Sequence, residues 1–312
     1  MMSTLNILLE QIALFVIYIA VGVILVRTRV LNSGSLDVVS RLVVKLALPV
    51  MIFINSVSGV DRSTLISALP VLLPAAAMFL LLFLMSLLLI RLFRLTGDRA
   101  QVFKTLCMFG NVGFMGIPII TSIFPETGML YISLISIIDQ GLLWTAGSRI
   151  LMPVGSDKGK LNWRKLINPA VVAILLALLV ILTGISLPSV LDTALQKIGA
   201  CATPLAMIYL GGVFACMDIR RYLGRIEYYA VVVAKQCLFP ILFYLLLGLF
   251  PLAEEIRITV SLLSGMPGMS SIVMIANAQG SDGEYALGDI LVTTVCSIAT
   301  LPLIYWMMGM IG

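Results

Sequence analysis

The sequence contains no histidine and few charged residues. Of its 312 residues, 15 are Asp or Glu and 20 are Lys or Arg, so charged residues make up 11% of the chain. A soluble domain carries about 25%. Without histidine the chain lacks the commonest metal ligand and general base. Because no Walker, GxSxG or HExxH pattern occurs either, the sequence predicts that the protein is not an enzyme and needs no metal or cofactor.

Disulfide, zinc and secretion signals are missing as well. The five cysteines are an odd number, no CxxC pair occurs, and all five lie in or beside apolar segments. This pattern supports neither a disulfide framework nor a zinc site. The N-terminus has no basic stretch followed by a short apolar region and a cleavage site. We therefore expect the first apolar segment to be a retained membrane span.

What the chain has instead is a series of long apolar segments. Hydrophobic residues make up 61% of it, and about 20 apolar residues suffice for one helix to cross a bilayer. We predict an all-α polytopic membrane protein with ten transmembrane helices, at residues 6–26, 37–57, 69–90, 101–123, 129–151, 167–186, 195–216, 228–250, 256–278 and 286–309. The longest hydrophilic loop lies at the midpoint, so the chain divides into a first five-helix repeat (1–152), a cytoplasmic linker (153–166) and a second five-helix repeat (167–312).

Positive charge is distributed unevenly among the loops. Of the 20 Lys and Arg, 15 lie in the loops after predicted spans 1, 3, 5 and 7, and only three lie in the opposite loops. Cytoplasmic loops carry the excess of Lys and Arg, so both termini are predicted to face outside, in the cell (plasma or inner) membrane. The net charge of +5 follows mostly from these loops and does not indicate a nucleic-acid partner. One loop departs from the rule: the segment after span 9 should be cytoplasmic, yet it contains Asp282, Glu284 and Asp289 and no Lys or Arg.

Two of the apolar segments are interrupted by Gly and Pro. The first break runs from Phe109 to Pro118 in span 4 and the second from Ser264 to Gly268 in span 9, and Pro118 and Pro267 lie 149 residues apart. A broken helix survives in lipid only where its backbone lines a cavity or a site. A pair of breaks in the two halves points to the substrate site of a secondary transporter. The alternative is a pair of ordinary kinks, since Gly and Pro are common in transmembrane helices.

If the breaks form a site, the ends of the half-helices are its main feature. We expect half-helices to start at Pro118 and Pro267 and to meet near the midplane, where their N-termini offer N–H donors and partial positive charge to an anion. Asn111 adds a donor and an acceptor. The candidate substrate-binding residues are Asn111, Gly113, Gly116, Pro118, Gly265, Pro267 and Gly268.

The spacing of prolines also predicts an internal repeat. Pro49 in span 2 and Pro204 in span 7 lie 155 residues apart, a separation similar to that of the two breaks. Five helices per repeat is an odd number, so the second repeat must be inverted relative to the first. We therefore expect two inverted five-helix repeats whose fourth helices are broken.

Charged residues inside the predicted spans are candidates for coupling. Asp139 lies near the centre of span 5 and is followed by Gln140. An acid at that depth costs about 2.5–3.5 kcal/mol, so Asp139 should face the interior, be protonated or have a partner. It is either a proton-coupling or site-shaping residue, or a structural acid bonded to a neighbouring helix. Lys45 in span 2 and Lys235 in span 8 either snorkel towards the interface or serve Asp139 or an anionic substrate.

Several motifs in the chain resemble those of the auxin efflux carrier family, which includes bacterial malate and malonate permease-like carriers and the plant PIN auxin exporters. The likeness covers essentially the whole chain. The motifs are Leu48-Pro49, the run from Asn111 to Pro118 (NVGFMGIP), the run from Asp139 to Thr145 (DQGLLWT), Asn168-Pro169 and Met266-Pro267.

This resemblance implies a fold similar to that of the bile acid:sodium symporters, in which broken helices 4 and 9 cross. It implies a scaffold of spans 1, 2, 6 and 7 beside a transport unit of spans 3–5 and 8–10. A homodimer formed through the scaffold and elevator-type alternating access come with it. No acidic cluster lies at the breaks, so proton coupling is expected rather than sodium coupling.

Residues and resemblance together predict a secondary active transporter in the lipid bilayer that moves small organic anions, such as carboxylates or auxin-like weak acids. The alternatives are a channel for small anions or neutral solutes and a non-transporting membrane receptor. A carrier saturates and shows counterflow, a channel does neither, and a receptor moves no solute.

Overall fold

A computed structural model of the chain describes residues 2–57, 62–156, 169–218 and 220–311, and all regular secondary structure in those ranges is helical. The α-helices are α1 (Met2–Arg27), α2 (Ser33–Leu42), α3 (Leu48–Val57), α4 (Arg62–Ala68), α5 (Leu72–Leu92), α6 (Gly97–Met108), α7 (Ile117–Ile123), α8 (Gly128–Leu142), α9 (Ser148–Ile150), α10 (Pro169–Thr183), α11 (Ser189–Ala200), α12 (Ala202–Cys216), α13 (Arg220–Leu223), α14 (Ile226–Val231), α15 (Phe239–Leu247), α16 (Glu254–Ser264), α17 (Ser271–Ala278) and α18 (Gly283–Ile311). Four segments have π-helical geometry, namely η1 (Val43–Ala47), η3 (Val112–Gly116), η4 (Leu143–Gly147) and η6 (Val232–Leu238), and η2 (Leu69–Val71) is a 3-10 turn. Asn168 and most of the predicted linker at 153–166 lie outside the described residues.

Six helical stretches of the described chain are long and apolar enough to cross a membrane. They are Leu5–Arg27, Leu65–Leu92, Gly128–Ile150, Ser189–Cys216, Ile226–Leu247 and Gly283–Ile311, and they coincide with predicted spans 1, 3, 5, 7, 8 and 10. Predicted spans 4 and 9 are each divided into two helices, α6 with α7 and α16 with α17. An all-helical membrane fold is therefore confirmed, while the count of ten helices and the inverted repeat stay predictions.

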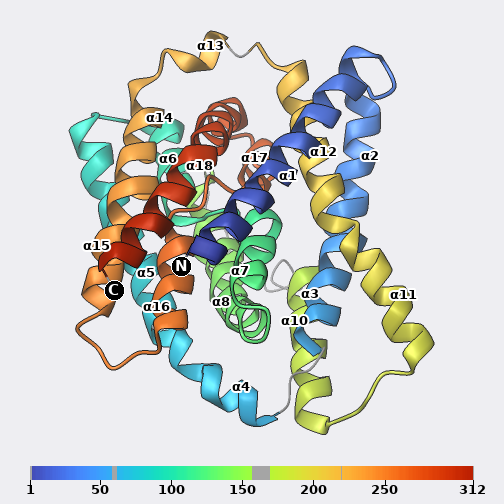
Figure 1. The fold of residues 1–312 in the computed structure, drawn as a ribbon. Helices are drawn as coiled ribbons and strands as arrows, with labels where there is room; N and C mark the ends of the chain where they lie inside the picture. The colour runs from blue at the N-terminus through green and yellow to red at the C-terminus, as the bar shows by residue number, and fades with distance from the viewer. Residues whose placement is uncertain (1, 58–61, 157–168, 219, 312) are drawn as a thin grey trace.

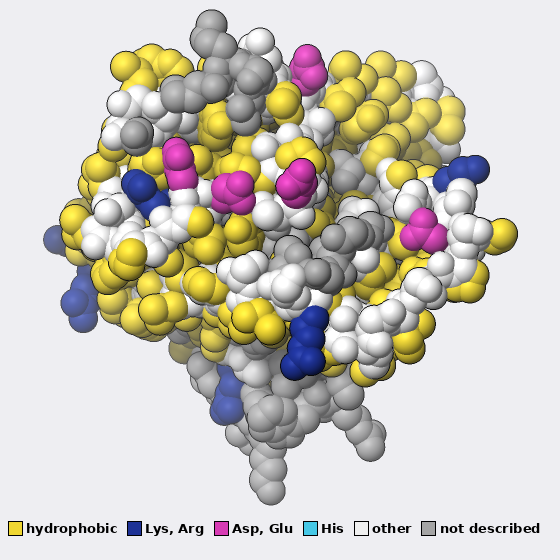
Figure 2. Space-filling view, turned by 60° about the horizontal axis from the view of Figure 1, so that its bottom comes forward, with side chains coloured by type: hydrophobic (Ala, Val, Ile, Leu, Met, Phe, Trp, Pro, Cys, Tyr) yellow, Lys and Arg dark blue, Asp and Glu magenta, His cyan; other side chains and the backbone are white. Residues whose placement is uncertain are grey.

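The surface of the molecule has the composition expected of a protein embedded in lipid. Large apolar side chains project outward from the membrane-length helices, and on one of them Leu73 is 79% and Leu92 69% exposed. Viewed from the end that carries α4, hydrophobic side chains cover much of the described surface and charged side chains are scattered (Figure 2). Exposed apolar area on this scale marks contact with a membrane or a partner.

Prolines explain three of the four π-helical segments. Pro49, Pro118 and Pro240 each lie two residues after the end of η1, η3 and η6. A proline has no N–H, and its ring clashes with the carbonyl four residues earlier. That carbonyl lies inside the π-helical segment in each case. The wider π-helical turn makes room for the proline ring and for the carbonyl that has lost its N–H partner. Such turns are frequent at functional sites, and η1 and η6 contain Lys45 and Lys235.

The helices form two groups (Figure 1). The flanking group consists of α1–α3 and α10–α12, in which α1 lies against α12 and α3 packs against α10 and α11. The crossing group consists of α5–α9 and α14–α18. Small residues let membrane helices approach closely. A Cβ placed on Gly22 of α1 would lie only 2.0 Å from the carbonyl oxygen of Ile208 of α12, so this pair of helices admits no larger residue there.

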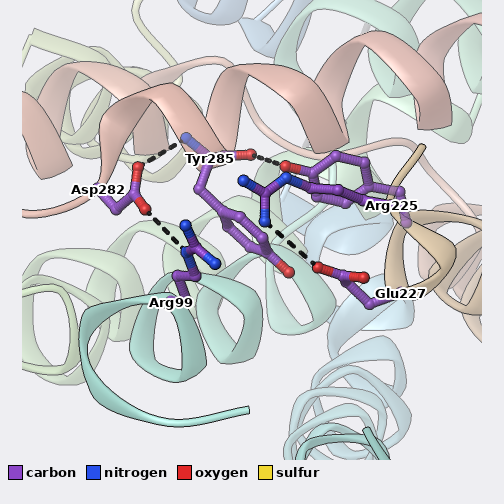
Figure 3. A network of polar contacts seen from close by, with 6 residues as sticks. Arg99, Arg225, Glu227, Asp282 and Tyr285 are labelled. Atoms are coloured by element: carbon purple, nitrogen blue, oxygen red, sulfur yellow. Dashed lines mark hydrogen bonds and ion pairs between the residues drawn. The ribbon is translucent and has the colours of Figure 1, made fainter. Parts of the chain in front are cut away.

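The acidic loop between α17 and α18 is neutralised by arginines from two other loops. Asp282 lies 3.5 Å from Arg99, and Figure 3 shows the two side chains facing each other at the start of α18. Glu284 lies 2.7 Å from Arg221 and accepts a hydrogen bond from Tyr222 at 2.9 Å. Burial, followed by the bond to Glu284, raises the pKa of Tyr222, so this hydroxyl stays a donor at neutral pH. The acidic loop thus lies on the same side as the basic loops, which removes the exception in the charge pattern.

Candidate functional site

The two breaks predicted from the sequence touch each other. Helices α6 and α16 both end at a break, and the extended segments that follow them form a single antiparallel bridge between Gly110 and Gly268. The backbone N–H of Asn111 donates to the carbonyl oxygen of Pro267 at 2.8 Å. Each break therefore supplies a hydrogen-bond partner to the other, which matters because lipid supplies none.

Of the two prolines that were expected to start half-helices, only Pro118 lies in the first turn of an α-helix. The first begins at Val112 of η3, where Asn111 is the N-cap and its Oδ1 accepts the N–H of Phe114 at 3.3 Å. The second begins at Ser271 of α17. Pro118 follows η3 within a continuous helix, and Pro267 lies in the crossing itself. The predicted start at Pro267 was wrong, because α17 begins four residues later. Pro118 does lie in the first turn of α7, and η3 extends this half-helix back to Asn111, whose side chain accepts one of the first free N–H groups.

A cavity of about 220 Å³ lies beside the crossing, between the flanking and crossing groups. Five of the residues singled out in the sequence line it, namely Lys45, Asn111, Gly113, Asp139 and Gln140. The structure thus brings together residues from η1, the first break and α8. Ser136 and Ser271 line it too and were not predicted. Ser271 could have been found from the sequence, because serine is common at helix starts and this one follows the second break.

Asp139 is the only carboxylate among the described residues that line this cavity, and it is 1% exposed. Its Oδ2 accepts a hydrogen bond from Nε2 of Gln140 at 2.9 Å, and Oε1 of Gln140 accepts one from Nε1 of Trp144 at 3.2 Å. Its Oδ1 has no hydrogen-bond donor among the described residues. The suggested partner Lys45 forms no ion pair with Asp139 in the described part of the chain, and its side chain is exposed. The two residues therefore share the cavity without contacting each other.

Gly116, Pro118, Gly265, Pro267 and Gly268 do not line the cavity. The three glycines are contact points between elements. An added Cβ would lie 2.7 Å from the Leu263 side chain of α16 at Gly116, 2.8 Å from a proline ring at Gly265, and 3.0 Å from a side chain of α18 at Gly268. They let the broken segments pack closely, and they place the lining residues without contacting the cavity themselves.

Lys235 does not snorkel. It is 1% exposed, and its Nζ donates to the carbonyl oxygens of Leu106 at 2.8 Å and of Phe109 at 3.3 Å. These carbonyls belong to the last turn of α6 and its C-cap. The final carbonyls of a helix have no partner within it and carry partial negative charge. The ammonium therefore caps the half-helix that leads into the first break.

Comparison with known proteins identifies the family of the chain. The sequence pattern of a family described as "Membrane transport protein" matches residues 7–160 and 158–305. The chain belongs to this family, the auxin efflux carriers. A protein of Rhizobium meliloti (strain 1021) named "Putative malonate transporter" is 27% identical over 209 residues, and the match covers 62% of each chain. The chain thus spans less than two thirds of the length of this relative. Family membership and the apolar helices together identify a multi-pass membrane transport protein.

Proposed function

We propose that the protein is a secondary active transporter of small organic anions and that the cavity beside the crossing is its substrate site. The observation that carries this proposal is that both half-helices begin at the cavity. Val112 and Gly113 of η3 and Ser271 of α17 all line it. The N-terminus of a helix offers free N–H groups and partial positive charge, which suits a carboxylate.

Lys45 adds a positive charge to the wall of the cavity that is formed by η1. It forms no ion pair with any described residue, so its ammonium is available to a ligand. A dicarboxylate placed between Lys45 and the starts of the half-helices has one favourable partner for each acidic group. Pockets for drug-sized ligands measure about 300–1,000 Å³, so a cavity of about 220 Å³ suits a smaller molecule. These features, together with the name of the relative, favour short dicarboxylates such as malonate over auxin-like weak acids.

Asp139 gives the site its coupling role in this proposal. A carboxylate in the wall of an anion site repels the substrate unless it is protonated. Gln140 and Trp144 hold one of its oxygens, and the other has no donor among the described residues. Binding of the anion is therefore linked to a proton at Asp139, and the transporter moves anion and proton together. Sodium is the less favoured coupling ion.

We also propose the two inverted five-helix repeats, with elevator-type movement of the crossing group past the flanking group. Helices α8 and α18 start at Gly128 and Gly283, which lie 155 residues apart, as do Pro49 and Pro204. The cavity between the two groups supports relative movement. The hydroxyls of Ser56 in α3 and Ser133 in α8, 2.5 Å apart, join the groups and must separate during it. A homodimer through the flanking group, in the plasma or inner membrane with both termini outside, completes the proposal.

Counterflow of radiolabelled malonate in proteoliposomes tests this function. Vesicles preloaded with unlabelled malonate should accumulate label with saturating kinetics, and unlabelled malate and indole-3-acetate added outside rank the competitors. Lys45→Gln should reduce uptake at low malonate concentration, whereas Glu126→Gln, at an exposed position that does not line the cavity, should not. Flux that never saturates and shows no counterflow would identify a channel. Binding without flux would identify a receptor.

A further inference from the structure

The buried charges of the molecule do not balance. Among the described residues, three charged side chains are buried: Asp139 and Lys235 are each 1% exposed, and Asp289 is 0% exposed. Asp289 had been assigned to the acidic loop from the sequence, but α18 begins at Gly283 and places Asp289 two turns inside the helix. Two acids and one base give the interior one excess negative charge if all three are ionised. A buried charge without a partner costs several kcal/mol in practice.

The three residues come from three different elements that lie at the crossing. Asp139 on α8 lines the cavity. Asp289 on α18 lies against the second break, since a Cβ placed on Gly268 would be 3.1 Å from its Oδ2. Lys235 on η6 lies against the end of α6 at the first break, within electrostatic reach of both carboxyls but without an ion pair to either. One ammonium is therefore near two carboxyls, one that lines the cavity and one that lies beside the second break.

Hydrogen bonding does not compensate the excess charge. The ammonium of Lys235 donates to two backbone carbonyls, and one oxygen of Asp139 accepts from Gln140. The other oxygen of Asp139 and both oxygens of Asp289 have no donor among the described residues. Only one cation lies near the two carboxyls, and three of their four oxygens have no donor among the described residues. Binding one proton would make the net charge of the three side chains zero.

Neighbouring groups add little net charge. Glu227 on α14 is ion-paired with Arg225 at 3.7 Å, Lys45 on η1 is exposed, and Cys107 on α6 and the hydroxyls of Tyr228 and Tyr285 are uncharged groups at neutral pH. Figure 3 shows Arg225 and Glu227 facing each other beside Tyr285. Helix α17, which also packs on α18, carries no titratable side chain. The balance is thus set by the three buried residues.

We propose that Asp139, Lys235 and Asp289 form one charge-balanced site that holds a single exchangeable proton shared between the two carboxyls, and that this proton is the coupling ion of the transporter. The coupling role of this proton rests on the proposed function, whereas the sharing of the proton between the two carboxyls does not. Interacting carboxyls titrate as a unit and not as separate residues. An anion in the cavity draws the proton to Asp139, and Asp289 then takes the negative charge opposite Lys235. When the substrate leaves, the proton is free to move to Asp289 or to leave the protein.

Infrared difference spectroscopy of the purified protein over a pH series tests the site without any substrate. The wild type should show one C=O stretch of a buried protonated carboxyl that titrates. Both Asp139→Asn and Asp289→Asn should lose this band, because the single remaining carboxyl and Lys235 are already neutral together. Glu126→Gln is the control and should retain it. If an Asn variant fails to fold, Asp139→Glu or Asp289→Glu should fold and shift the frequency of the band. A band that survives in either Asn variant, or that neither Glu variant shifts, overturns the shared site.

Transport in proteoliposomes tests the role of the proton. Asp289→Asn leaves every residue that lines the cavity in place but leaves Asp139 ionised beside Lys235. This variant should lose the stimulation of malonate uptake by an inwardly directed proton gradient, and its malonate counterflow should weaken because the ionised Asp139 repels the anion. Stimulation that persists in Asp289→Asn refutes the coupling role. Absence of counterflow in the wild type refutes the proposed function instead, and the infrared result still decides the shared site.

Discussion

Replacing Lys235 with Met tests whether the first break depends on a buried ammonium. The Nζ of Lys235 donates to carbonyl oxygens of Leu106 and Phe109 at 2.8 and 3.3 Å. Hydrogen bonds to charged groups contribute roughly 1.5–3 kcal/mol each, so losing both costs roughly 3–6 kcal/mol. The apolar methionine returns part of this through burial. We expect the free energy of unfolding to fall by about 3 kcal/mol, which is a change of roughly a hundredfold in the unfolding equilibrium.

The assay is unfolding by SDS in mixed micelles, followed by tryptophan fluorescence. Lys45→Met is the matched control, because Lys45 also sits in a π-helical segment before a proline but is exposed. Exposed substitutions change stability by about 0.5 kcal/mol or less, so this variant should unfold like the wild type and lose malonate affinity instead. Equal unfolding midpoints for the two variants would show that the break does not need its lysine cap.

Three further predictions concern the site, the packing and the topology. Asn111→Ala should weaken malonate binding by roughly 1–3 kcal/mol in calorimetry, because it removes both a cavity group and a helix cap; unchanged affinity in folded protein would remove Asn111 from the site. Gly22→Ala should destabilise the protein strongly in thermal unfolding, since its Cβ would lie 2.0 Å from a carbonyl oxygen of α12, whereas Gly141→Ala, with no atom within 4 Å, should be neutral or slightly stabilising. In a cysteine-free background, an impermeant thiol reagent added outside should label a cysteine at Glu254 and spare one at Arg220; the opposite pattern would reverse the proposed orientation.

Local sequence features predicted the breaks and several lining residues well. Gly110 and Gly268 are needed because two backbones meet there, and such close approach depends on residue size, which the sequence shows directly. Asn111 and Asp139 were recognisable because a polar side chain at membrane depth is costly and therefore rarely accidental. Helix starts were harder, since the choice between a proline and an asparagine cap depends on which free N–H groups find partners.

The contrast between Lys45 and Lys235 shows what sequence alone does not contain. Both lie in the cytoplasmic half of a predicted span, and the same two interpretations were open for each. One lines the cavity with an exposed side chain, and the other is buried against the end of α6. The difference depends on a helix end more than 120 residues away, at Leu106 and Phe109. Asp289 was misplaced for a related reason, because its position relative to the helix start at Gly283 decided whether it counted as loop or core.

The hydrogen bond between Asn111 and Pro267 has a consequence for how the protein is assembled. It joins residues from the two halves of the chain, and the bridge between Gly110 and Gly268 does the same. Neither half can satisfy the backbone of its own break while it is alone in lipid. During synthesis, the first break therefore stays without its partner until the second half has been inserted. Two separately expressed halves should be degraded singly and should accumulate when produced together, because each completes the interrupted helix of the other.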